Sequence, residues 1–403
     1  MKKRRLSLTL ALLAVSGSPA LADWTAFRGS AGNGFADAPD LPVSLDEKKS
    51  ISWKTTLPGR GLSCPVVVGD RVFLTASSGP RQERLHVLAF STADGTQLWE
   101  RQFVATGRTN CHKKTCVAAP TPVSDGKLLV AQFSSNDVFC LDLDGNLKWL
   151  RGLTNDYPNA ANSLGMSSSP VIAGGVLVTQ VENDADSFAA ALDLATGKTL
   201  WLKARPKGAN WTSPAPLLDA DGKTPLVALQ SKTGVLVVEP RAGSERWTYA
   251  DGASTIPSST FHAGKLYIPS HGLTALLPGK DGRSHKQVWQ ENKLRPGTAS
   301  PVASGGKLYV INNANVLTAA DPAAGSLLWR LRVTGPFSAS PVANKTHAYL
   351  LSEKGLLQVV DLQGKEGKIV STLDLAETHL GTPAISGNAL YLRSDQHLRK
   401  IGG

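Results

Sequence analysis

Tryptophan is the most regularly spaced residue of this chain. Seven of its nine tryptophans recur at intervals of 40 to 52 residues, and self-similarity at such a period is typical of a repeat architecture. A glycine precedes five of the seven by four positions, so these five are expected on strands that begin after a tight turn. We expect the repeated tryptophans to lie on outer strands and to pack between neighbouring repeats. The seven are Trp53, Trp99, Trp149, Trp201, Trp247, Trp289 and Trp329.

A second marker runs out of phase with the first. It consists of serine or threonine followed by proline at the head of a β-rich run, and proline suits the first residue of a strand because no ladder hydrogen bond is lost there. The copies are Thr121-Pro122, Ser169-Pro170, Ser213-Pro214, Ser300-Pro301, Ser340-Pro341 and Thr382-Pro383. Ser63-Cys64-Pro65 is a near match, and Ser259-Thr260 keeps the place without proline. The markers therefore predict eight units.

Each unit has the pattern of four short meandering strands. In the third unit, strands are expected at 170–172, 176–181, 188–192 and 199–203, separated by turns and a polar loop. Such a unit is too small to bury its own apolar faces, so its neighbours must cover it. A linear stack of units would leave two exposed ends, whereas a ring leaves none.

The two ends of the chain predict that the ring closes. The last unit has two clear strands, 383–385 and 389–393, and a third at 397–401, and it ends without a tryptophan. The strand at 51–55, which carries Trp53, has no unit before it. Joined to the last unit, this strand supplies the missing outer strand. The sequence thus predicts an all-β fold: an eight-bladed β-propeller of four-stranded antiparallel blades, its last blade closed by the N-terminal strand.

The first 22 of the 403 residues have the pattern of a secretory signal peptide. Basic residues 2–5 precede an apolar run at 6–15 and a small-residue cleavage site, so we expect export to the periplasm or the extracellular space, with Asp23 as the first mature residue. The expected divisions are this signal (1–22), an N-terminal extension (23–50) and one propeller domain (51–403). The apolar run is about half of the roughly 20 residues that cross a bilayer, so no membrane span is expected.

Charge and cysteine content argue against several classes of protein. The formal net charge of +11 is not gathered in a basic tract, which argues against nucleic-acid binding. The cysteines lack the paired spacing of a zinc site, so no metal centre is expected. In an oxidising compartment we expect one loop disulfide, Cys111 with Cys116, and two buried thiols, Cys64 and Cys140. We also expect a monomer.

Strand order sorts the loops onto two faces. Turns from the first to the second strand and from the third to the fourth share one face and are short. Loops from the second to the third strand share the other face with the crossings to the next blade, and these are long. Long loops on a rigid scaffold are where binding residues gather. Around the channel mouth on this long-loop face we expect the Ser/Thr markers and Arg60, Arg108, His112, Lys113, Asn162 and Trp211.

Each of these residues also has a structural interpretation. The basic side chains either gather to attract an anionic partner or belong to a solvated loop. Trp211 either stacks on a ligand or packs within its own loop. For His112 a hydrogen-bonding loop role is favoured over metal ligation, because no partner stands at ligand spacing apart from the two cysteines expected to pair. The sequence nominates no catalytic residue.

The repeats resemble those of pyrroloquinoline quinone (PQQ) β-propellers. Residues 191–201, Ala-Leu-Asp-Leu-Ala-Thr-Gly-Lys-Thr-Leu-Trp, match the tryptophan-docking repeat A-x-D-x-x-T-G-x-x-x-W in full. The opening Trp24-x-x-Phe27-Arg28-Gly29, with Gly32-Asn33-Gly34, is similar to the start of exported bacterial PQQ-like or BamB-like propeller proteins. The resemblance spans nearly the entire mature chain, and in this family the docking motif is structural.

The resemblance implies two classes of function. Quinoprotein dehydrogenases use an adjacent Cys-Cys disulfide over PQQ, acidic ligands for calcium and a catalytic aspartate, whereas this chain has no adjacent cysteine pair. The outer-membrane assembly factor BamB uses its propeller as a binding scaffold and is a lipoprotein with a cysteine directly after its signal, where this chain has Asp23.

We therefore expect an exported, non-enzymatic scaffold that binds a protein or an extracellular polymer through the long-loop face and needs no cofactor. The alternative is a PQQ-dependent oxidoreductase that holds PQQ and calcium at the channel mouth, near Arg60, His112, Lys113 and Trp211.

Overall fold

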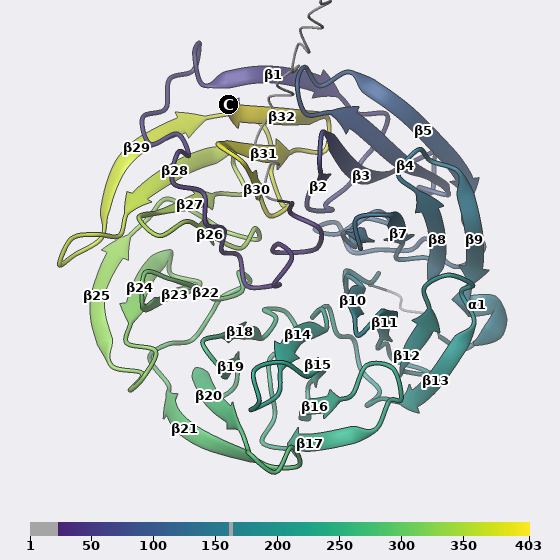
Figure 1. Cartoon of the computed structure of the whole chain (residues 1–403). Helices are drawn as coiled ribbons and strands as arrows, with labels where there is room; N and C mark the ends of the chain where they lie inside the picture. Colours follow the sequence, from purple (N-terminus) through teal and green to yellow (C-terminus); the bar gives the residue numbers. More distant parts are fainter. Residues whose placement is uncertain (1–22, 161–163) are drawn as a thin grey trace, which may run out of the picture.

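The computed structural model describes residues 23–160 and 164–403. The expected signal peptide, residues 1–22, lies outside this part of the chain. Within it, 32 strands form eight four-stranded antiparallel sheets around a central axis (Figure 1). The predicted eight-bladed propeller is confirmed. In the same two ranges, no helix combines the length and apolar character needed to cross a membrane.

Seven blades use consecutive strands, the innermost first. Blades 1 and 2 contain β2 (Val66–Val68), β3 (Arg71–Ser78), β4 (Arg84–Ser91) and β5 (Gln97–Val104), then β6 (Val123–Ser124), β7 (Leu128–Gln132), β8 (Asp137–Asp142) and β9 (Leu147–Gly152). Blades 3 and 4 contain β10 (Val171–Ala173), β11 (Val176–Val181), β12 (Phe188–Asp193) and β13 (Thr199–Ala204), then β14 (Ala215–Leu218), β15 (Pro225–Ser231), β16 (Gly234–Val238) and β17 (Glu245–Tyr249).

Blades 5 to 7 repeat the pattern. Blade 5 contains β18 (Thr260–His262), β19 (Lys265–Ile268), β20 (Leu273–Pro278) and β21 (His285–Glu291). Blades 6 and 7 contain β22 (Val302–Ser304), β23 (Lys307–Ile311), β24 (Val316–Ala320) and β25 (Leu327–Arg332), then β26 (Val342–Ala343), β27 (His347–Leu351), β28 (Leu356–Asp361) and β29 (Lys368–Asp374). A single-turn helix, α1 (Leu153–Asp156), lies in the crossing from blade 2 to blade 3.

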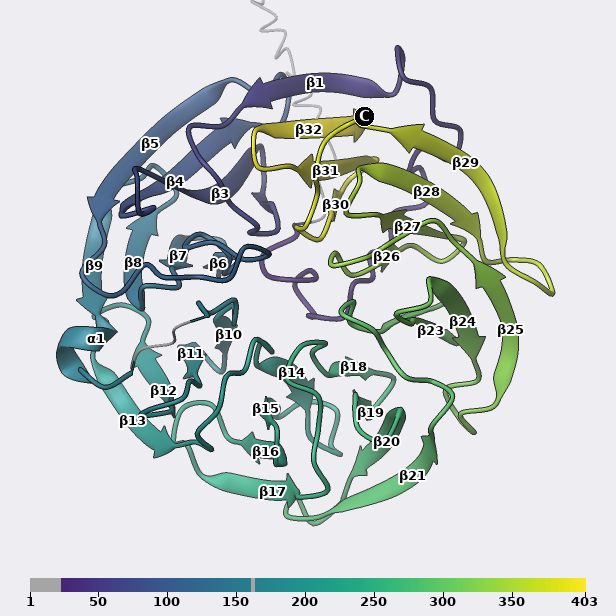
Figure 2. The ribbon, with the colours of Figure 1, turned by 180° about the vertical axis from the view of Figure 1, so that it is seen from behind.

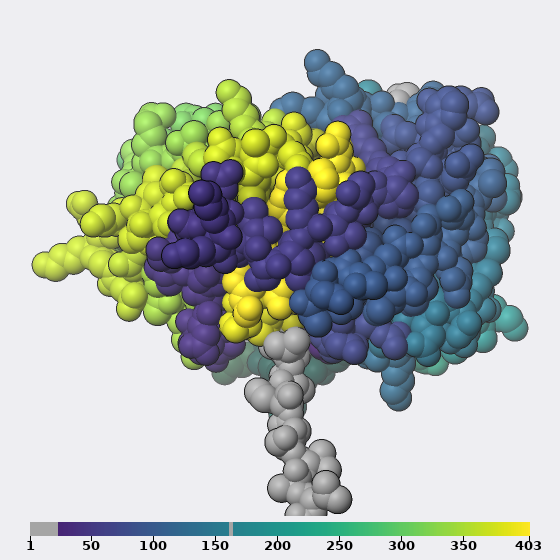
Figure 3. Space-filling model, turned by 90° about the horizontal axis from the view of Figure 1, so that it is seen from above, coloured from purple at the N-terminus to yellow at the C-terminus, as the bar shows by residue number. Residues whose placement is uncertain are grey.

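Blade 8 joins the two ends of the chain. It takes its inner strands from the C-terminal end, β30 (Ala384–Ser386), β31 (Ala389–Arg393) and β32 (His397–Gly402), and its outer strand from β1 (Ile51–Thr56). Trp53 lies opposite Lys400 in the antiparallel pairing of β1 with β32, and its ring centroid is 6.0 Å from that of Tyr391. Figure 3 shows the purple N-terminal and yellow C-terminal residues side by side at this junction.

The burial of a strand follows from its place in the blade. Inner strands such as β11 are buried at every position, because neighbouring blades cover both faces of the sheet. In outer strands such as β25, exposed positions alternate with buried or half-buried ones. The apolar core is therefore divided among the junctions between blades, and one cluster contains residues of both blade 3 and blade 4.

The repeated tryptophans dock seven of the eight outer strands on the following blade, and the eighth, β29, carries no tryptophan. The indole Nε1 of Trp149 donates to the carbonyl oxygen of Leu194 at 2.9 Å, and that of Trp201 to the carbonyl oxygen of Pro240 at 2.8 Å. The turn glycine of the following blade lies against the ring, since a Cβ on Gly197 would be 2.7 Å from Trp149. The recurring glycine therefore makes room for the tryptophan of the preceding blade as well as forming its own turn.

Gly197→Ala should destabilise the protein by about 2–4 kcal/mol, because the methyl group would overlap Trp149 and the residue has a φ of +71°. Gly175→Ala is the matched control, since Gly175 has a φ of +76° and open space around its Cβ position. It should cost only about 1 kcal/mol. Urea unfolding of the two variants measures the difference, and equal losses would contradict the docking role of the glycine.

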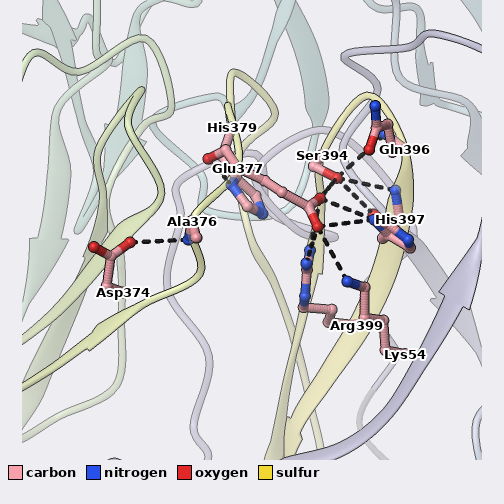
Figure 4. A network of polar contacts seen from close by, with 9 residues as sticks. All are labelled: Lys54, Asp374, Ala376, Glu377, His379, Ser394, Gln396, His397 and Arg399. Atoms are coloured by element: carbon pink, nitrogen blue, oxygen red, sulfur yellow. Dashed lines mark hydrogen bonds and ion pairs between the residues drawn. The ribbon is translucent and has the colours of Figure 1, made fainter. Parts of the chain in front are cut away.

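Glu377 ties the crossing that follows blade 7 to the closing blade (Figure 4). Its carboxylate receives hydrogen bonds from Lys54 of β1 at 3.1 Å, from Arg399 and His397 of β32, and from the hydroxyl of Ser394. Partial burial alone would raise the pKa of Glu377, but these hydrogen bonds outweigh it and hold the pKa well below its usual range. The carboxylate is therefore ionised in the folded protein at neutral pH.

His379 lies beside this network and is fully buried. Burial lowers its pKa to about 4, although its Nδ1 is 2.9 Å from the carbonyl oxygen of Glu377. The imidazole is therefore neutral at pH 7 and adds no positive charge next to Arg399.

Glu377→Gln should lower the free energy of unfolding at pH 7 by about 2 kcal/mol. A depressed carboxyl pKa stabilises the folded state above the unfolded pKa of about 4.3, and this contribution is lost as the pH falls further. The deficit of the variant should thus shrink between pH 7 and pH 3 in urea unfolding. Glu366→Gln, at an exposed glutamate, is the control. A deficit of the same size at both pH values would contradict the role of the ionised network.

Candidate binding site at the centre of the long-loop face

The two kinds of loop lie on opposite faces, as strand order predicts. On the short-turn face, the amide of Thr92 in the β4–β5 turn donates to the carbonyl of Asp70 in the β2–β3 turn at 2.8 Å. On the long-loop face, the amide of Val117 in the crossing to blade 2 donates to the side chain of Gln82, in the β3–β4 loop, at 3.1 Å.

A belt of hydrogen bonds joins the blades around the axis. At seven junctions among the described residues, the backbone amide at the head of one blade donates to a serine or threonine hydroxyl at the head of the next, over 2.9–3.0 Å. We call these seven acceptors the hydroxyl belt: Thr121, Ser169, Ser213, Ser258, Ser300, Ser340 and Thr382.

Two belt positions differ from the sequence markers. In blade 5 the hydroxyl is that of Ser258, because Ser259 occupies the place that proline has in other blades. In blade 1 the position is held by Cys64 rather than Ser63, and the Cys64 thiol contacts the carbonyl oxygen of Pro383 in blade 8 at 3.7 Å. Burial raises the pKa of this thiol to about 12, so a neutral thiol occupies the eighth junction.

The N-terminal extension closes the axis on the side of the short turns. The purple trace of this segment crosses the middle of the ring in Figures 1 and 2. Trp24 pairs with Val67 of blade 1, and Phe35 pairs with Ala343 of blade 7. Between these two, Gly32 reaches Pro216 of blade 4, which lies 2.9 Å from its Cβ position, so residues 24–35 span the hub. We call this segment the plug.

Arg28 anchors the plug in the hub. Its side chain is 1% exposed, and its guanidinium donates to the carbonyl of Ser259 at 3.3 Å, to the hydroxyl of Thr260 at 2.6 Å, and to the carbonyl of Pro301. One side chain thereby links the plug to blades 5 and 6. Phe27, the residue before it, lines the cavity above the plug and also a smaller cavity between the plug and residues of blades 2 to 5.

The central pocket is the cavity of about 460 Å³ that lies above the plug. The hydroxyl belt surrounds its base and Phe27 forms part of its floor. Crossings of the long-loop face supply its walls, and among the described lining residues there is no aspartate or glutamate. The other wall residues are Leu62, His112, Lys114, Thr115, Ala119, Leu164, Ser167, Trp211, Ile256, Thr298, Ser338 and Leu380.

The structure brings two of the predicted binding residues, His112 and Trp211, to the central pocket. Trp211 packs within the loops as well, because its Nε1 donates to the carbonyl of Gly165 at 3.0 Å. The ring of His112 makes a local bond, since its Nδ1 accepts from the amide of Lys114 at 3.2 Å. The described residues contain no cluster of three or more histidine, cysteine or acidic side chains suited to a metal ion.

The other predicted binding residues lie elsewhere or outside the described chain. Arg60 is in a neighbouring hollow, paired with Asp395 at 3.1 Å and donating to the carbonyl of Lys113 at 2.8 Å. Arg108 and Lys113 are exposed and do not line the pocket, where Lys114 is found instead. Asn162 lies outside the described residues.

Cys111 and Cys116 are free thiols in the structure, unlike the expected disulfide. The side chain of Cys116 is buried in the core between blades 1 and 2, and burial raises its pKa to about 12. Cys111 is half-buried, and its sulfur lies 3.5 Å from the amide nitrogen of Gln82. The two side chains therefore have different surroundings within one loop.

Blade 1 also contains a polar relay that the sequence spacing did not indicate. The hydroxyl of Ser78 is 2.7 Å from Nε2 of His86, whose Nδ1 is 2.6 Å from the carboxylate of Glu100. This is the order of nucleophile, base and acid found in acyl-transfer triads. The relay does not line the central pocket, and the backbone at Gly59 packs against Ser78. We therefore assign it to the stability of the blade.

These features define an eight-bladed propeller with tryptophan-docked blades and a central pocket closed at its base. The chain belongs to the family described as outer membrane protein assembly factor BamB, whose profile matches residues 35–249 and 279–393. Its fold is that of BamB from Moraxella catarrhalis, with a TM-score of 0.61, 17% identity, and coverage of 87% of this chain and 98% of that one.

Dehydrogenases share the fold as well. A europium-containing methanol dehydrogenase gives a TM-score of 0.72 at 11% identity, covering 96% of this chain and 98% of that chain. The quinohemoprotein alcohol dehydrogenase of Comamonas testosteroni gives 0.69 at 13% identity, covering 94% and 80%. A polyvinylalcohol dehydrogenase of Sphingopyxis sp. (strain 113P3) is 25% identical over 193 residues, 44% of this chain. That match spans only 28% of the length of the enzyme.

Arg28→Ala should destabilise the protein by about 2–4 kcal/mol, because it removes three buried hydrogen bonds that join the plug to blades 5 and 6. It should also speed limited proteolysis within residues 23–36. The control is Arg108→Ala, at an exposed arginine, which should leave both measurements unchanged. If the plug of Arg28→Ala resisted protease as well as the wild type, Arg28 would not be its anchor.

Proposed function

We propose that this protein is an exported, non-enzymatic binding scaffold that receives part of a protein or polymer chain in the central pocket. The observation that carries the proposal is the pocket itself, about 460 Å³, closed below by the plug and bordered by long crossings. Ligand sites of this size occur where a rigid scaffold presents a concave, mostly apolar surface with a few placed polar groups. The family supports the same class of function, because its description is that of an assembly factor.

The residues of the central pocket do not fit the calcium–quinone pair of a dehydrogenase. Calcium prefers several oxygen ligands, usually including carboxylates, and the described lining residues supply hydroxyl groups but no carboxylate. Glu353 contacts two lining residues, but its carboxylate already accepts from Lys114 at 3.0 Å and from the hydroxyl of Ser338 at 2.7 Å. We therefore derive no oxidation step for this site.

The second candidate is a PQQ-dependent oxidoreductase. It is favoured by one stretch of similarity to a polyvinylalcohol dehydrogenase and by the cationic and aromatic side chains of Lys114, His112 and Trp211 in the pocket wall. Titration of the purified protein with PQQ and calcium, followed by dye-linked turnover of alcohols, separates the candidates. Binding with turnover would establish the enzyme and contradict the scaffold.

Filling the pocket should abolish capture of the binding partner. Thr298 is exposed and lines the pocket, so Thr298→Trp should occupy much of its volume without disturbing the core. Thr248→Trp places the same side chain on an exposed position of the outer strand β17. In crosslinking and affinity capture from periplasmic extract, we expect the Thr298 variant to retain less than about a tenth of the partner. Equal capture by both variants would contradict the proposal.

A further inference from the structure

The hydroxyl belt has hydrogen-bond capacity that the junctions between blades do not use. Each hydroxyl accepts an amide through one lone pair, and a hydroxyl also carries one proton that it can donate. The belt side chains are nearly fully buried, Ser213 being 5% exposed, and they line the central pocket. The base of the pocket therefore offers several O–H donors to whatever occupies it.

The hydroxyl donors at the base favour an occupant that accepts hydrogen bonds. Lys114 supplies an ammonium group at the wall, and no carboxylate of the described lining residues competes for the hydroxyl protons. Glu353 balances Lys114 from outside the lining, so the net charge at the wall is small. A carboxylate suits such a site because it only accepts hydrogen bonds, and those to charged groups are the stronger ones.

The upper wall is suited to an apolar group. Leu164 and Ile256 are 40% and 46% exposed, although both are large aliphatic residues on the pocket wall. Trp211 and Leu380 add further apolar surface there, and Phe27 lies at the floor. Exposed apolar surface that lines a concave site is typical of ligand contact.

We propose that the central pocket binds a carboxylate with an apolar body, its carboxylate held by belt hydroxyls and its apolar part against Trp211, Leu164 and Ile256. The proposal rests on the binding function proposed above and names the chemistry of the occupant. A medium-chain fatty acid and the C-terminus of an apolar polypeptide both have this chemistry.

Matched probes test the carboxylate directly. Isothermal titration calorimetry of the full-length mature protein compares decanoate with decanamide, and the peptide Gly-Ala-Leu-Phe with its C-terminal amide. We expect each acid to bind at least about tenfold tighter than its amide, the size of effect that charge-assisted hydrogen bonds produce. The tighter of the two acids identifies the source of the occupant. Equal affinity of acid and amide in both pairs would overturn the proposal.

Paired variants place the carboxylate in the pocket. Lys114→Met and Ser213→Ala should each reduce the preference for acid over amide by about tenfold. Lys113→Met changes the neighbouring exposed lysine, which does not line the pocket. Ser304→Ala removes a different hydrogen bond between blades, from the Ser304 hydroxyl to the carbonyl of Asn344. Both controls should keep the preference, and a preference that survives in Lys114→Met and Ser213→Ala would contradict the assigned position.

The experiments distinguish a failure of the carboxylate proposal from a failure of the proposed binding function. If no acid is preferred while Thr298→Trp still loses its partner, the scaffold stands and the carboxylate specificity is wrong. If decanoate or the peptide binds with the expected preference while Thr298→Trp retains its partner, the pocket binds a carboxylate and the partner uses another surface. Thermal unfolding of each variant verifies that it is folded, and Lys114→Met, at an exposed position, keeps the test valid if Ser213→Ala is unstable.

Discussion

One kind of hydrogen bond sets the geometry of the hub: at seven of the eight junctions, a backbone amide at the head of one blade donates to a hydroxyl of the next blade. These amides are buried, and a buried amide without an acceptor costs about 1–3 kcal/mol. Serine and threonine satisfy it with a short side chain, which keeps eight strands close to the axis without filling it. The requirement explains why a marker recurs in every unit and why the pocket is lined with hydroxyl groups. The junctions between blades and the lining of the pocket thus depend on the same residues.

The plug makes the central opening a pocket with a floor. A ring of eight blades encloses a channel, and residues 24–35 cross it from blade 1 to blade 7. Arg28 connects the crossing segment to blades 5 and 6, and Phe27 lines both the central pocket and the smaller cavity beside the plug. The central pocket is consequently open toward the long-loop face, where the long crossings between blades lie. The N-terminal extension therefore forms part of the pocket through Phe27, although none of its residues belongs to a blade strand.

The parts of the structure that could be predicted from sequence are those that the repeat imposes. Trp53 without a preceding unit, and a last unit without a tryptophan, predicted the pairing of β1 with β32. The Ser/Thr markers predicted which side chains surround the axis, with an error of one residue in two blades. In blade 5, Ser258 and Ser259 are both serines and no proline sets the register, and in blade 1 Cys64 takes the place of Ser63. His112 and Trp211 were placed at the mouth because they lie in long crossings.

The remainder of the pocket depends on the conformation of the loops, and loop residues do not recur at the repeat spacing. The sequence does not show which of the adjacent Lys113 and Lys114 lines the pocket. Leu164 and Ile256 likewise belong to no repeated motif. The spacing of Cys111 and Cys116 suggested a bridge, whereas the fold buries one thiol in a blade junction and leaves the other on the loop. The path of the plug depends on contacts with residues more than 200 positions away, such as those of Arg28 with Thr260 and Pro301.

Hydrogen–deuterium exchange of the protein in complex with its captured partner tests most directly whether the long-loop face around the central pocket is the binding surface. If this face binds the partner, we expect slower amide exchange on binding in the crossings at residues 105–119 and 252–258. Exchange in the opposite turns at residues 92–96 and 194–198 should not change. Protection confined to those turns or to the outer strands, with both crossings unaffected, would contradict it.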